Sequence, residues 1–108
     1  MRTVFNLLKE IHKRPGLYLG WDEQHRVRQL QDLEMLLYGY ATALKHHGIQ
    51  EQVMDFNREF GDYLRQTRGW SLSCGPTAAI VGATANEQEA WSLFWELVDE
   101  FRASIEGN

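Results

Sequence analysis

Residues 86–105 read NEQEAWSLFWELVDEFRASI, and this stretch decides the fold class. Its apolar residues recur at intervals of three and four, the spacing that puts side chains on one face of an α-helix. They are Trp91, Phe94, Trp95, Val98, Phe101 and Ile105. Asn86 with Glu89 three residues later has the form of a capping box, with Asn in place of Ser or Thr. The pattern predicts a helix that ends at about Ser104 and packs both tryptophans into the core.

The start of the chain carries the same kind of pattern. Residues 3–13 hold a short apolar stripe at helical spacing, and Thr3 is suited to be its N-cap. Pro15-Gly16 should end this helix, because the residue before proline avoids helical geometry and Pro-Gly favours a type II turn. The following apolar stretch is expected to be an ordered loop that folds back onto the core through Leu17, Leu19 and Trp21.

The longest predicted helix runs from about Gln24 to His47 and should be central, since its apolar face is wide. Gly39 lies inside it, where glycine costs about 1 kcal/mol relative to alanine. We expect close approach of another helix or an aromatic ring at that point. Gly48 is suited to the C′ position that ends the helix.

Two further segments complete the predicted fold. A third helix is expected from about Gln50 to Gln66, followed by an apolar run within Ser71–Thr84 that suits either a short helix or a strand. Helix is favoured, with Pro76 at its first position, because no partner strand is evident elsewhere. Four to five helices with short connections predict an all-α bundle or orthogonal array that forms one domain over residues 1–108.

Composition limits the function classes. The chain has 15 acidic and 11 basic residues and a net charge of −4, which argues against nucleic-acid binding and permits a basic protein partner. It has a single cysteine, Cys74, so no internal disulfide is expected. The sequence shows neither a membrane-length apolar run nor a signal-peptide pattern, and these features together predict a cytoplasmic protein that does not bind a membrane.

No motif predicts catalysis, a metal or a cofactor. The four histidines lack the spacing of a zinc site, and the glycines of 69–82 match no phosphate-binding pattern. Cys74 matches no catalytic cysteine signature and is expected to be a partly buried structural thiol. A small enzyme that acts through Cys74 or a histidine cluster is the least favoured alternative.

The third predicted helix carries the main candidate site. Four carboxylates at intervals of four, four and three should lie on one exposed face; they are Glu51, Asp55, Glu59 and Asp62. This acidic strip is either an ordinary solvated face or a docking strip for a basic partner. Tyr63 and Trp70 are candidate aromatic anchors beside it. A second candidate surface is aromatic, since Trp and Tyr are common at binding hot spots. It draws on Tyr18, Trp21, Trp70, Trp91 and Trp95, although the helical spacing of Trp91 and Trp95 favours core filling for those two.

Two stretches resemble a known group of proteins. RPGLYLG at residues 14–20, after a helix, and EAWSLFWELVDEF at residues 89–101 are similar to the opening and closing segments of small bacterial immunity proteins, including those of contact-dependent growth inhibition. Leu17 stands where the group often has Met, and Trp91 and Trp95 stand where it often has Phe. The middle of the chain carries no shared motif.

The resemblance implies a small cytosolic protein without catalysis or cofactor. Such a protein neutralises a cognate toxin domain, commonly a basic nuclease, by covering its active site. The alternative is a non-catalytic helical adaptor or regulatory subunit for another bacterial protein.

Overall fold

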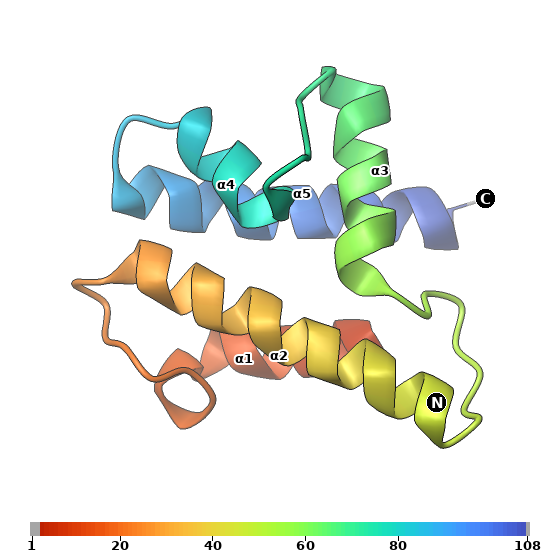
Figure 1. The fold of residues 1–108 in the computed structure, drawn as a ribbon. Coiled ribbons are helices and arrows are strands. Elements are labelled where there is room, and N and C mark those ends of the chain that lie inside the picture. Colours follow the sequence, from red (N-terminus) through yellow and green to blue (C-terminus); the bar gives the residue numbers. More distant parts are fainter. Residues whose placement is uncertain (1–2, 108) are drawn as a thin grey trace.

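The computed structural model describes residues 3–107, and every regular element within that range is helical, which confirms the all-α prediction (Figure 1). The elements are α1 Val4–Lys13, the 3-10 turn η1 Pro15–Leu17, α2 Arg26–His46, α3 Phe56–Arg68, α4 Gly75–Gly82 and α5 Glu87–Glu106. Within this range no helix is both long enough and apolar enough to cross a membrane.

Local sequence signals set several helix ends as predicted. The Thr3 hydroxyl accepts a hydrogen bond from the Phe5 amide, and the Asn6 side chain accepts one from the Thr3 amide, which closes a capping box on α1. Asn86 caps α5 by accepting from the Glu89 amide at 2.9 Å, but Glu89 accepts from the Ala85 amide and not from that of Asn86, so only half of the predicted capping box forms. These bonds satisfy amides that have no partner within the helix.

Gly39, within α2, and Gly48, just beyond its end, differ in role. Gly48 has a φ of +64°, the left-handed conformation that glycine adopts without a Cβ penalty, and so confirms the predicted helix end. Gly39 is exposed, and no atom lies within 4 Å of the place where its Cβ would be. The predicted close approach of a helix or ring at Gly39 is therefore wrong, because the residue lies on the solvent face of α2.

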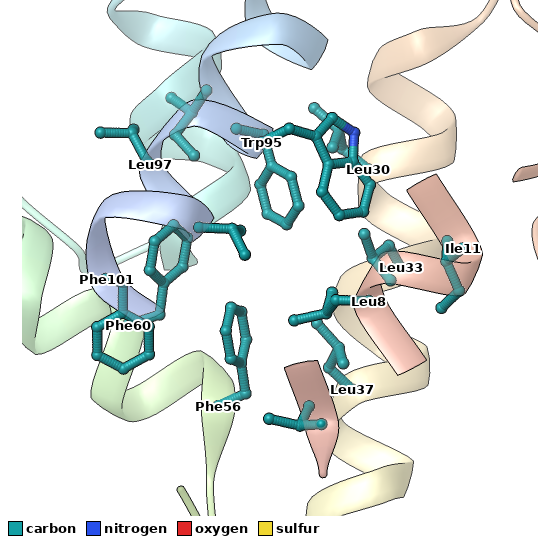
Figure 2. Close-up of a cluster of buried hydrophobic side chains, with 14 of the residues drawn as sticks. Leu8, Ile11, Leu30, Leu33, Leu37, Phe56, Phe60, Trp95, Leu97 and Phe101 are labelled. Carbon is teal, nitrogen blue, oxygen red and sulfur yellow. The ribbon is translucent and has the colours of Figure 1, made fainter. Parts of the chain in front are cut away.

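The core joins aliphatic side chains from α1 and α2 to aromatic rings from α3 and α5 (Figure 2). Phe60 is fully buried, and its ring lies 5.0 Å from Phe56, 5.8 Å from Phe94 and 5.6 Å from Phe101 between centroids. Trp91 and Trp95 are both buried in this core, as their helical spacing predicted.

The undecided apolar run forms α4, so the helix reading of Ser71–Thr84 is confirmed. Pro76 lies in its first turn. Glu34 of α2 accepts a hydrogen bond from the Thr77 amide at 3.1 Å, and its backbone carbonyl accepts one from the Asn57 side chain. The buried side of α2 thus ties α3 and α4 together, while α3 lies across α5 (Figure 1).

Candidate functional site

The predicted acidic strip does not form on one helix face. α3 begins at Phe56 rather than near Gln50, so Glu51 lies in the preceding loop and Asp55 is the N-cap. Glu51 accepts hydrogen bonds from the Val4 amide at 3.0 Å and from the Tyr40 hydroxyl. Burial and this hydrogen bond hold the pKa of Tyr40 well above its usual value. Glu51 therefore links the loop to α1 and α2 and is not a free surface charge.

The next two carboxylates, those of Asp55 and Glu59, accept hydrogen bonds from backbone amides at the start of α3. Asp55 accepts from the Arg58 amide, and Glu59 accepts from the amides of Met54 and Asp55 at 3.1 Å each. Asp55 thus caps the helix while Glu59, one position beyond that of a capping box, reaches back to the preceding amides, so both carboxylates satisfy amides at the start of α3. The spacing that suggested a charged strip is in part the spacing of a helix cap. Their predicted role in toxin binding stays a prediction.

The remaining predicted site residues are also engaged within the fold. Asp62 forms an ion pair with Arg65 at 2.9 Å. The Tyr63 ring is half-buried and lies 5.4 Å from the Phe101 ring. Trp70 is half-buried against the core, with the Arg68 guanidinium 6.0 Å from its ring. Neither aromatic side chain projects as an open anchor.

A different surface presents free apolar side chains. We call residues 15–21 the PGLYLGW loop; it joins α1 to α2 at one end of the molecule, in orange and red at the left of Figure 1. Leu17 is 70% exposed, Trp21 42% and Tyr18 39%. Leu19 alone is buried. The prediction that Leu17 and Trp21 fold back onto the core is therefore wrong, while that for Leu19 is confirmed.

The local backbone explains this outcome. Pro15–Leu17 forms a 3-10 turn, in which the amides of Tyr18 and Leu19 both bond to the Pro15 carbonyl. Gly16 does not have the positive φ that the third position of a type II turn requires, so the predicted turn type is wrong. The tight turn points Leu19 inward and leaves Leu17 in solvent.

The PGLYLGW loop is held in place although its side chains are exposed. The Gly20 amide donates to Asp32, and the Tyr18 hydroxyl donates to Glu10 at 3.0 Å. The side-chain amide of Gln29, which is fully buried, donates to the Trp21 carbonyl at 2.6 Å. These bonds run to α1 and α2, so the loop backbone is fixed from both sides.

The following residues add a second set of contacts. The Arg28 guanidinium lies 4.6 Å from the Trp21 ring, and His25 bonds to Asp22 at 2.8 Å. The hydrogen bond from His25 is the main reason that the pKa of Asp22 lies below its usual value. The Gln88 side chain of α5 donates to the Glu23 carbonyl. The start of α5 therefore contacts the segment between the PGLYLGW loop and α2, at a residue 65 positions away in sequence.

The residues considered for chemistry are dispersed. His46 and His47 are neighbours at the end of α2, His25 pairs with Asp22, and His12 stacks on Trp95 at 4.2 Å. Within residues 3–107 no group of three or more His, Cys, Asp or Glu side chains is arranged to hold a metal ion.

Cys74 is exposed, not partly buried as predicted. It occupies the N-cap position of α4, whose buried side chains are Pro76, Thr77 and Ile80.

No protein-family model matches this chain, and the comparisons with curated proteins and with solved structures found no significant match. The sequence signal that could have indicated the PGLYLGW loop is its composition: four large apolar or aromatic residues close to Pro and Gly, outside any helical repeat. Such a stretch either fills a core or forms a contact surface, and only the three-dimensional fold separates the two.

Proposed function

We propose that this chain binds and neutralises a bacterial toxin domain, such as a nuclease, by covering its active site, and that the PGLYLGW loop is the main contact. The observation that carries the proposal is the exposure of Leu17, Tyr18 and Trp21 on a backbone fixed by hydrogen bonds to α1 and α2. Burying a large apolar side chain against a partner contributes roughly 1.5–3 kcal/mol to the free energy of binding. A preformed loop avoids most of the ordering cost of binding.

The resemblance to immunity proteins supports the same assignment. Its two stretches, at residues 14–20 and 89–101, lie far apart in the chain but belong to adjoining parts of the fold. The His12 ring, just before the first stretch, stacks on Trp95 of the second at an interplanar angle of 3°. This contact supports treating the two stretches, under the proposal, as parts of one structural unit that includes the exposed loop.

Calorimetric titration tests the proposal directly, with the toxin domain encoded beside this chain as the binding partner. Tight one-to-one binding is expected. Truncation of a central aromatic anchor costs about 2 kcal/mol, so Trp21→Ala should weaken binding by roughly thirtyfold. Leu17→Ala should also weaken it.

Met35→Ala is the matched control, because Met35 is 68% exposed on α2, close to the 70% of Leu17. It should leave affinity unchanged, and circular dichroism should show all three variants folded. If the affinity is unchanged in both loop variants but falls in Asp62→Ala, the binding site lies at the acidic residues and not at the loop. Absence of binding would contradict toxin neutralisation and favour the adaptor function.

A further inference from the structure

The arginines of α3 and α5 that lie at the surface are neutralised within the fold. Ion pairs join Arg58 to Asp55, Arg65 to Asp62, Arg68 to Glu100 and Arg102 to Glu106, at 3.7, 2.9, 2.8 and 2.8 Å. Among the described residues, Lys9, Lys13 and Arg14 have no carboxylate within ion-pair distance, and all three are exposed. Their charges remain available to a partner.

These three cations gather beside the PGLYLGW loop. They line one hollow of about 500 Å³ between α1 and η1, together with Leu17, Tyr18, Asn6 and Glu10. Lys9 and Lys13 are four residues apart, so they lie on one face of α1. Glu10 is the single carboxylate of the hollow, and it already accepts the hydrogen bond of Tyr18. We call this feature the cationic hollow.

The charge of the hollow is opposite to that of the whole chain. Three cations face one carboxylate here, whereas the chain as a whole has a net charge of −4. A cationic rim around an exposed Leu17 complements a surface that offers carboxylates around an apolar group. The hydroxyl of Tyr18 adds no charge to the hollow, because its hydrogen bond to Glu10 raises the pKa of Tyr18 above its usual value and keeps the hydroxyl neutral.

We infer that the cationic hollow receives an acidic segment of the partner protein, with carboxylates against Lys9, Lys13 and Arg14 and an apolar side chain on Leu17. The inference rests on the proposed function for the nature of the partner. The net charge of the chain suggested a partner with a basic contact surface, whereas this inference expects an acidic contact surface on the partner. An acidic contact is compatible with a nuclease, since carboxylates hold the metal ions of metal-dependent nucleases.

A protein segment fits this surface better than a nucleic acid does. Phosphate binding draws its affinity from extended basic surfaces, and a strand that leaves the hollow would meet an acidic molecule with 15 Asp and Glu residues.

The test uses the full chain labelled with ¹⁵N and titrated with a short peptide of glutamate and leucine. Amide shifts should centre on Lys13, Arg14 and Leu17. The double variant Lys13→Ala with Arg14→Ala should weaken the peptide roughly threefold to tenfold, the range of two exposed ion pairs. Lys45→Ala, an exposed and unpaired cation at the far end of α2, should leave binding unchanged.

Two other probes separate the competing ligands. A peptide with lysine in place of glutamate should not shift the hollow, and a single-stranded oligothymidylate should bind more weakly than the acidic peptide. Equal shifts with the lysine peptide, tighter binding of the DNA or shifts centred elsewhere would each overturn the inference.

The toxin domain then distinguishes this inference from the proposed function. Weaker toxin binding by the double variant supports both. Unchanged toxin binding overturns the acidic contact and leaves neutralisation standing. Failure of the toxin to bind, while the acidic peptide still maps to the hollow, overturns neutralisation and keeps the hollow as an acidic-segment site.

Discussion

Removal of the Glu51 side chain tests whether this residue holds the fold together or serves a partner. In the structure its two carboxylate oxygens accept from the Val4 amide, which is at the start of α1, and from the Tyr40 hydroxyl of α2. The first turn of α1 contains no acidic residue of its own. Glu51 therefore supplies the negative charge that the helix dipole favours at that end, from 47 residues away.

The expected cost of Glu51→Ala follows from these contacts. A hydrogen bond to a charged acceptor contributes about 1.5–3 kcal/mol, and a charge at a helix terminus adds about 0.3–1 kcal/mol. Glu51 accepts two such bonds and is only half-buried, so the lower ends of these ranges apply, and we expect a loss of about 3 kcal/mol in the free energy of unfolding. In a domain of this size that loss lowers Tm by roughly 10–20 °C.

Urea and thermal unfolding followed by circular dichroism measure this loss. Glu51→Gln retains an acceptor but no charge, so it should lose about half as much. Glu96→Ala removes an exposed carboxylate of α5 and should change stability by less than about 0.5 kcal/mol. In a double-mutant cycle, Tyr40→Phe and Glu51→Ala should be strongly non-additive.

Wild-type stability in Glu51→Ala would refute the contact. If that variant also bound the toxin domain more weakly, Glu51 would belong to the docking strip that the sequence suggested.

Three further outcomes are expected. Gly39→Ala should stabilise the protein by about 1 kcal/mol in urea unfolding, because its Cβ meets open space on an exposed helix; a destabilised variant would contradict this placement. Gly48→Ala should destabilise it by about 1 kcal/mol, since φ is +64° there; equal stability would argue against the left-handed helix end. Burial lowers the pKa of His12 below 6.5, against the opposing charge of Asp99. The unfolded chain then binds more protons, so stability should fall as pH drops below about 6.5, and a Tm series should show a shallower fall in His12→Phe. An identical pH dependence in that variant would assign the effect to other groups.

Local patterns predicted most of the helices because their causes lie within a few residues. The apolar repeat of residues 86–105 predicted a helix to about Ser104, and α5 spans Glu87–Glu106. Asn86 and Gly48 act on backbone groups close to them in sequence, so their effects on the helix ends could be predicted without knowledge of the fold. The predicted start of α3 was wrong because Glu51 and Asp55 have the spacing of residues on one helix face. In the structure Glu51 instead bonds to the Val4 amide from a loop, and Asp55 caps a helix that begins at Phe56.

The residues alone were enough to predict that this chain is all-α, where most of its helices begin and end, and that Trp91 and Trp95 belong to the core. These properties follow from periodicity and from short-range hydrogen bonds. Which charged side chains are paired within the protein and which are unpaired depends instead on long-range packing, so it became clear only from the folded structure. Lys13 and Asp62 look alike as surface charges in the sequence, yet Asp62 is paired with Arg65 and Lys13 faces an open hollow. The 3-10 turn that exposes Leu17 is likewise held in place by hydrogen bonds to Glu10 of α1 and to Asp32 and Gln29 of α2, which the sequence pattern does not reveal.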